Sequence, residues 1–186
     1  MNFTVDLLWV SEGIPAPVWP IGKVRLAQPF VASLARVLGE RASSSNTDAV
    51  LFWDASLGTP NQAFIQELAV SPVDCWHAGL KLGMGGSPGV LDFMSPTWML
   101  ACDPPANIDA TSWRLSLRAC LVKMDVLRKL GGPCPEFQTL EVAALEMGHR
   151  WVRRGALMRH VPELLDHRTT GLPTQRSVVT GPVVPK

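Results

Sequence analysis

The sequence has no marked excess of charge of either sign and no long apolar run, and both absences exclude classes of protein. The 17 Lys and Arg against 16 Asp and Glu give a formal net charge of +1, so neither a nucleic acid nor an anionic membrane is expected as the main partner. No apolar stretch approaches the ~20 residues that a bilayer requires, so no transmembrane segment is expected. Residues 1–13 have no cationic start and no small-residue cleavage site, which argues against a signal peptide. We therefore expect a cytoplasmic protein.

The sequence also lacks closely spaced cysteines. Its 4 cysteines are far apart and form no CxxC pair. Free cysteine is often buried in cytosolic proteins, where disulfides are rare. We therefore expect free, buried thiols at Cys75, Cys102, Cys120 and Cys134.

What remains is an ordinary globular composition whose apolar runs predict an α/β fold. The length of 186 residues suits one domain with a substantial core. Residues 3–10 and 49–53 are apolar runs typical of buried strands, and residues 28–42 have apolar positions at helical spacing. A strand, a helix and a strand in this order imply a right-handed parallel crossover. Residues 11–47 are expected to hold one loop and one helix.

The second half contains recognisable start and stop signals. Residues 115–122 predict a strand. We expect Asp125 to cap the short helix that follows and Gly131 to end it. We expect Thr139 to cap a later helix that ends at Gly148.

Three further segments complete the expected organisation. Thr59 and Gln62 predict a capping box at the start of a helix. Residues 83–112 are rich in Gly and Pro, and a connection of this length in a compact domain is usually functional. Periodicity is lost from about residue 168, so we expect a single domain over 1–167 and an extended or disordered tail over 168–186.

Asp54 is the first candidate for a functional residue because it directly follows the buried strand at 49–53. In parallel α/β sheets, ligands bind outside the carboxyl ends of the strands. A carboxylate in this place can hold a hard cation, and the cation can neutralise a diphosphate. An aspartate here can equally cap the next turn, which is a common structural role. This stretch alone leaves both interpretations open.

Further motifs follow Asp54 in a characteristic order. They are Leu130-Gly131-Gly132, Glu141, Gly148-His149-Arg150, and Val161-Pro162 leading to His167. With Asp54, this order over residues 48–167 resembles the family 2 glycosyltransferases, which have the nucleotide-sugar-binding fold called GT-A. The resemblance implies an α/β fold with a mixed, mainly parallel sheet flanked by helices, reduced in its N-terminal half.

The resemblance also implies an activity, namely transfer of a sugar from a nucleotide-diphosphate donor to a hydroxyl of a glycan, a lipid or a small molecule. Inverting transfer needs a base for the acceptor proton and positive charge for the leaving diphosphate. By resemblance Glu141 is the catalytic base. Asp54 and His167 are the ligands of Mg²⁺ or Mn²⁺, and Ser56 lies with them at the donor diphosphate. The candidate substrate contacts are His77, Trp98, Trp113 and Arg150.

Several of these residues also have a purely structural interpretation. Glu141 suits the first turn of a helix, where the helix dipole favours a carboxylate. Tryptophans such as Trp98 and Trp113 commonly pack in cores and interfaces. His167 is equally typical of a surface position before a tail, and Arg150 of a solvated surface.

The chain departs from the family pattern, and the departures favour a second function. Ser56 replaces the second carboxylate of the Asp-x-Asp motif, and Val142 stands in place of the second acidic residue of the catalytic motif. Residues 11–47 are too few for the family's nucleotide-reading segment, and the proline-rich loop 14–20 with Trp19 is the candidate replacement. The alternative is therefore a non-catalytic, glycosyltransferase-like module that binds a ligand or docks on a protein partner or a second copy. Nucleotidyl transfer ranks lower because no Gly-rich loop with Lys or Arg follows the first strand.

Overall fold

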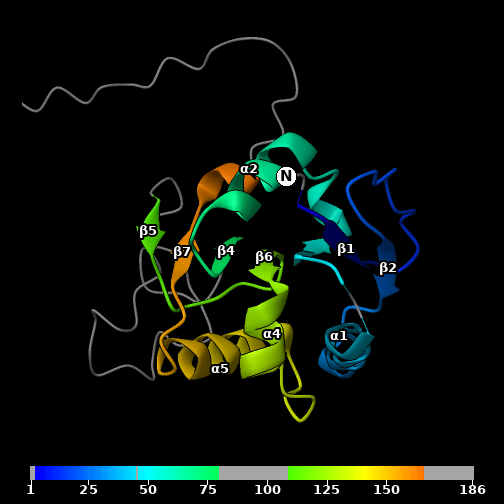
Figure 1. Ribbon diagram of the computed structural model, residues 1–186. Coiled ribbons are helices and arrows are strands. Elements are labelled where there is room, and N and C mark those ends of the chain that lie inside the picture. The colour runs from blue at the N-terminus through cyan, green and yellow to red at the C-terminus, as the bar shows by residue number, and fades with distance from the viewer. Residues whose placement is uncertain (1–2, 45, 80–108, 166–186) are drawn as a thin grey trace, which may run out of the picture.

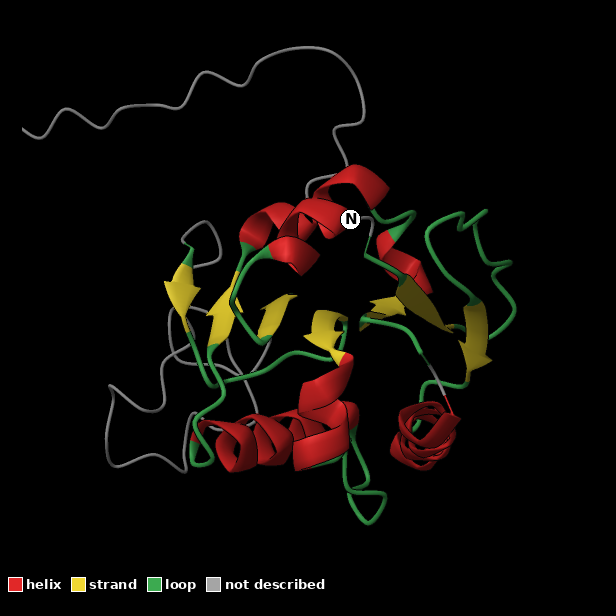
Figure 2. Cartoon of the chain, in the orientation of Figure 1, coloured by secondary structure: helices red, strands yellow, loops and turns green. Residues whose placement is uncertain are grey.

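The computed structural model describes residues 3–44, 46–79 and 109–165, and these residues form an α/β fold in three layers (Figure 1). Within these ranges, a mixed sheet of seven strands forms the central layer. Helices cover both faces of the sheet (Figure 2). The expected α/β class, with a mixed sheet flanked by helices, is confirmed.

The strand directions bring most strand ends to one edge of the sheet. In spatial order the strands are β2 (Val24–Ala27), β1 (Val5–Val10), β3 (Ala49–Asp54), β6 (Ala119–Lys123), β4 (Cys75–Ala78), β7 (Met158–His160) and β5 (Ala110–Thr111). β1 is parallel to β2 and β3, β4 is parallel to β7, and β6 is antiparallel to both β3 and β4. Because β6 reverses the direction twice, β2, β1, β3, β4 and β7 end at the same edge, where β6 begins. We call this edge the carboxyl edge.

Two helical layers bury the two faces of the sheet. One face is covered by α1 (Val31–Ser44), α4 (Met124–Leu130) and α5 (Leu140–Val152), and the other by α2 (Gln62–Val70) and the short 3₁₀ helix η2 (Pro162–Leu165) (Figure 1). Alternate strand residues divide between these layers: Leu8 and Phe52 pack with the α1 side, whereas Trp9 and Trp53 pack with the α2 side. None of the helices in the described ranges has the length and apolar character needed to span a bilayer.

The segment 11–47 contains a strand that the sequence interpretation missed. β2 pairs in parallel with β1 at the outer edge of the sheet, and its Leu26 is 69% exposed. Gly22 allows the chain to approach β1 closely, because a Cβ there would lie 1.9 Å from the carbonyl oxygen of Val5. The expectation of one loop and one helix is wrong because a four-residue edge strand with a largely exposed face carries little apolar periodicity.

The N-cap of α2 lies two residues after the one that the sequence predicts. Asn61 is the N-cap, and its Oδ1 accepts a hydrogen bond from the Phe64 backbone N–H at 3.2 Å. The predicted capping box of Thr59 and Gln62 is therefore wrong. Asn61 takes the capping position because Asn is at least as good an N-cap as Thr and directly precedes the first residue of the helix. The Gln62 side chain does not reach back to Thr59 and instead donates a hydrogen bond to the Val18 carbonyl oxygen at 2.9 Å.

α4 follows β6 without an intervening loop, and this continuity changes its start. Lys123 is the N-cap and makes no capping hydrogen bond through its side chain. Asp125, the predicted cap, lies inside the first turn and accepts a hydrogen bond from Arg128 Nη1 at 3.1 Å. The predicted end is confirmed, because Gly131 follows the helix with φ +77°.

α5 begins as predicted and ends later than predicted. The Thr139 hydroxyl accepts a hydrogen bond from the Val142 N–H at 3.3 Å. Gly148 does not end the helix, which continues to Val152. A Cβ at residue 148 would lie 2.1 Å from the carbonyl oxygen of Trp113, so this glycine serves close packing rather than termination.

The cysteines within the described ranges are free thiols, as expected. Cys75 and Cys120 are buried on neighbouring strands with their Sγ atoms 3.5 Å apart. Cys134 is free but only partly buried, so the expectation of burial is wrong for this residue. Cys102 lies outside the described residues.

Candidate functional site

Asp54 is the last residue of β3 and lies at the carboxyl edge. Its backbone N–H donates a hydrogen bond to the Arg118 carbonyl oxygen at 2.7 Å, which continues the β3–β6 ladder. Asp54 follows the alternation of Val50 and Phe52, so it belongs to the sheet face that α1, α4 and α5 cover. The buried strand therefore delivers a carboxylate to the edge where the sequence predicts it.

Both carboxylate oxygens of Asp54 have donors. Oδ2 accepts from the Nε of Arg118 at 3.1 Å, and Oδ1 accepts from the backbone N–H of Ser56 at 2.9 Å. Burial raises the pKa of Asp54, but the hydrogen bonds from Ser56 and the charge of Arg118 outweigh this effect and lower its pKa below the ordinary value. Asp54 is therefore an ionised carboxylate in an ion pair, and it also caps the 3₁₀ turn Ala55–Leu57.

Arg118 is the member of this site that the sequence interpretation missed. It directly precedes β6, and its side chain is 27% exposed at the carboxyl edge. Among the described residues, its two Nη atoms donate no hydrogen bond, and only its Nε is used in the ion pair. The sequence signal was indirect, because an arginine at the start of a strand meets an aspartate at the end of another only when the two strands pair antiparallel.

A pocket of about 430 Å³ opens at the same edge, between the ends of β1 and β2 and the first turns of α1. Ile14 and Leu26 supply apolar surface, and Ser11, Gln28, Ser33 and Arg36 supply polar groups. Val10, which precedes Ser11, pairs with Asp54 in the sheet. The pocket and the Asp54–Arg118 pair are therefore neighbours along the carboxyl edge. Its size is within the range of small-molecule sites.

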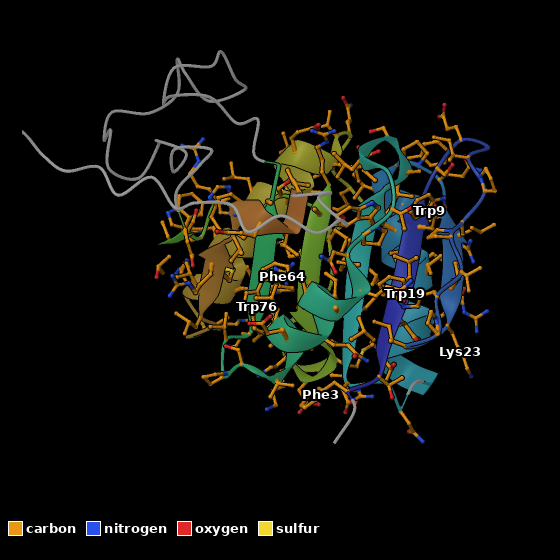
Figure 3. The ribbon with its side chains drawn as sticks, turned by 90° about the horizontal axis from the view of Figure 1, so that it is seen from above. Phe3, Trp9, Trp19, Lys23, Phe64 and Trp76 are labelled. Carbon is orange, nitrogen blue, oxygen red and sulfur yellow. The ribbon has the colours of Figure 1, made fainter. Side chains whose placement is uncertain are left out.

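Trp19 does not line this pocket, although the loop that carries it does contribute to the wall through Pro15 and Ala16. Trp19 is 6% exposed, and its indole N–H donates to the Val5 carbonyl oxygen at 2.7 Å. It packs in the same buried cluster as Trp9, on the sheet face that Figure 3 views. The ring of Trp19 therefore belongs to the core, and the replacement of the nucleotide-reading segment by loop 14–20 stays a prediction.

Glu141 lies in the first turn of α5 and is exposed. It shares the α1 side of the sheet with Asp54, because α5 covers that face. Among the described residues, no hydrogen bond or ion pair joins Glu141 to Asp54 or to Arg118. This position agrees with the helix-dipole interpretation and leaves the carboxylate accessible to a substrate.

His77 is a fully buried residue of β4. Its Nε2 lies 3.3 Å from the Ser112 carbonyl oxygen, and its ring centroid lies 5.7 Å from that of His160. Within the described part of the chain, its buried Nδ1 has no hydrogen-bond partner. Burial, together with His160, lowers the pKa of His77 to about 3, so the ring is neutral at physiological pH. The described neighbours separate it from solvent.

Arg150 joins two of the motifs into one structural unit. Its Nη1 contacts the Leu130 carbonyl oxygen, its Nη2 donates to the Gly132 carbonyl oxygen at 2.8 Å, and its Nε donates to Glu146 at 2.7 Å. The carbonyls at the end of α4 have no partners inside that helix, so Arg150 satisfies them. This guanidinium is therefore occupied by protein groups at the end of α4.

Trp113 is a partly buried residue that packs against the core. Its ring meets the His149 ring edge-on, with centroids 5.6 Å apart, and its carbonyl oxygen lies against Gly148. The structure therefore gives Trp113 a packing role between the segment before β6 and α5. His167, Trp98 and residues 83–108 of the expected loop lie outside the described residues, so the roles assigned to them stay predictions.

Asp54 as it stands does not fit the divalent cation that the resemblance implies. Magnesium and manganese prefer several carboxylate oxygens, whereas here one oxygen faces a guanidinium and the other a backbone N–H. Ser56 contributes only a hydroxyl, and the described residues contain no group of three or more His, Cys, Asp or Glu arranged to hold a metal.

No protein-family model matches this chain, and curated proteins give no significant match. The functional conclusion therefore depends on the geometry of the carboxyl edge.

Proposed function

We propose that this protein is a GT-A-like glycosyltransferase that moves a sugar from a nucleotide-diphosphate donor to an acceptor hydroxyl. The observation that carries this function is the position of the pocket of about 430 Å³ on the strand next to the Asp54–Arg118 pair, at the same carboxyl edge. A pocket suited to a nucleoside beside a guanidinium suited to phosphate matches the two halves of such a donor. Ligands of open α/β sheets bind at this kind of edge.

The placement of the motifs on the fold supports the same function. β6 leads into α4, which ends at Gly131, and α5 then carries Glu141 in its first turn. β7 leads to Val161-Pro162 on the α2 side of the sheet. This is the order of elements that the resemblance implies, on a sheet whose β6 is antiparallel to its neighbours.

The proposed reaction is a single displacement. Glu141 takes the proton of the acceptor hydroxyl, and the acceptor oxygen forms a bond to the anomeric carbon of the sugar. The bond from that carbon to the diphosphate oxygen breaks, and the electron pair stays on the diphosphate. Arg118 stabilises the negative charge that develops there.

A non-catalytic, glycosyltransferase-like binding module is the second candidate. It is favoured by Ser56, and by the absence of a contact between Glu141 and the Asp54–Arg118 pair among the described residues. Such a module binds the nucleotide and transfers nothing. Fold-level resemblance does not by itself separate the two.

Calorimetric titration of UDP, GDP and their sugars tests the proposed function. We expect micromolar binding that the variant Leu26→Asp abolishes, because residue 26 lines the pocket and is 69% exposed. Val70→Asp is the matched control, since Val70 is 62% exposed at the end of α2. Absence of binding to folded protein contradicts the proposal. Binding without release of nucleotide diphosphate from any sugar donor, with water or simple sugars as acceptors, favours the non-catalytic module.

A further inference from the structure

We infer, on the basis of the proposed function, that the donor diphosphate binds without a divalent cation and that Arg118 supplies the positive charge. The Asp54 carboxylate is committed to Arg118 at 3.1 Å and to the Ser56 N–H at 2.9 Å. A dication on Asp54 would displace the guanidinium or stand within a few ångströms of it. Either arrangement costs free energy, through a broken ion pair or through repulsion between like charges.

The charge at this edge makes a cation unnecessary. A pair of carboxylates repels a diphosphate unless a metal ion stands between them. Here Ser56 is neutral, and the single charge of Asp54 is balanced by that of Arg118. The net charge of this pair is therefore zero, so the pair itself exerts no net repulsion on a diphosphate.

Arg118 has the geometry to bind phosphate while it remains paired with Asp54. The ion pair uses Nε, and the two Nη atoms donate no hydrogen bond to any described residue. A guanidinium presents such outer N–H groups as a planar fork that fits two phosphate oxygens. The side chain is 27% exposed, so water screens its charge less than that of a fully solvated arginine.

The first experiment compares the binding of UDP and GDP in excess EDTA and in Mn²⁺. We expect the dissociation constant to agree within about threefold between the two conditions. Arg118→Ala weakens binding of the diphosphate by about 10-fold to 100-fold, the usual effect of a hydrogen bond to a charged group. Uridine and guanosine bind this variant as they bind the unchanged protein, because they carry no phosphate.

A matched control is available on α4. Arg128 pairs with Asp125 at the same distance of 3.1 Å, on a helix that starts at the opposite edge of the sheet. Arg128→Ala removes a more exposed ion pair of the same length, together with the hydrogen bond from Nε to the Ala42 carbonyl oxygen, and leaves the diphosphate affinity unchanged. Loss of affinity in both variants contradicts the specific role of Arg118.

Asp54→Asn separates the two possible roles of the aspartate without removing Arg118. If Asp54 is a metal ligand, this variant loses the diphosphate. According to our inference it keeps the affinity or gains a few-fold, because a negative charge is removed beside the phosphate. Asp54→Asn therefore distinguishes a metal ligand from an ion-pair partner of Arg118, even if Arg118→Ala does not fold.

The outcomes also separate this inference from the proposed function. Binding of UDP or GDP only in Mn²⁺, with loss in Asp54→Asn, overturns the inference and supports the transferase. No binding of any nucleotide in either condition overturns both. Binding in EDTA that depends on Arg118 supports both.

Discussion

Gly148 lies against the carbonyl oxygen of Trp113, and a Cβ at residue 148 would come within 2.1 Å of it. The contacted atom belongs to the backbone, so it cannot move aside as a flexible side chain can. This contact holds α5 against residues 113–115, in the segment that leads into β6.

We predict that Gly148→Ala destabilises the protein, although Ala favours helices. The gain in helix propensity is at most about 1 kcal/mol, whereas overpacking against fixed atoms costs about 1–3 kcal/mol. Gly39→Ala in α1 is the control: a Cβ there meets nothing within 4 Å, so this change is expected to stabilise by about 0.5–1 kcal/mol. Urea unfolding measures both, and a stabilised Gly148→Ala protein would contradict the close packing.

Arg150→Ala is expected to lower the free energy of unfolding by about 1–3 kcal/mol, because the carbonyls of Leu130 and Gly132 lose their donor. The affinity for UDP or GDP is expected to remain unchanged, since this guanidinium serves α4. Urea unfolding and calorimetry measure the two effects. Arg154→Ala, at an exposed position, is the control. A loss of nucleotide affinity with unchanged stability would instead support Arg150 as a substrate contact.

His77 is expected to make the protein less stable in acid. Its pKa in the folded state is about 3, below the ordinary 6.5. Below about pH 6.5, His77 therefore binds a proton in the unfolded chain, whereas in the folded chain it stays neutral down to about pH 3. Stability is complete above pH 6.5 and falls toward pH 3, with a slope that approaches about 1.4 kcal/mol per pH unit from this group.

Urea unfolding between pH 7.5 and about pH 4.5 tests this dependence. His77→Gln is expected to flatten it. His149→Gln, on the exposed side of α5, serves as the control and retains the original slope. An unchanged slope in His77→Gln would mean that His77 is protonated in the folded protein.

The thiols are expected to react at different rates. Burial raises the pKa of Cys75 well above its ordinary value, and Cys120 lies 3.5 Å away between the same layers. In a Cys102→Ser background, a thiol reagent at pH 7 is expected to modify the partly buried Cys134 first. Cys75 and Cys120 react only after unfolding. Rapid modification of all three in the folded protein would contradict the burial of the pair.

The termini of the elements show how local signals compete. Thr139 and Gly131 act as the sequence predicts, because each signal stands alone at its helix end. Asp125 does not act as a cap because β6 continues directly into α4, and its carboxylate then meets Arg128 one turn later. Capping residues therefore predict the end of a helix only where an adjacent strand or helix does not include the same residues.

The sequence by itself determined the α/β class, the buried strands β1 and β3, and the position of Asp54 at a strand end. These follow from apolar runs that are continuous because both faces of the sheet are covered. Only the tertiary structure decided the antiparallel direction of β6, the edge strand β2 and hence the pocket. Only the tertiary structure brings Arg118 into an ion pair with Asp54, because the two residues are 64 positions apart in the sequence. Strand pairing is a long-range choice made by packing, and no local pattern in the chain encodes it.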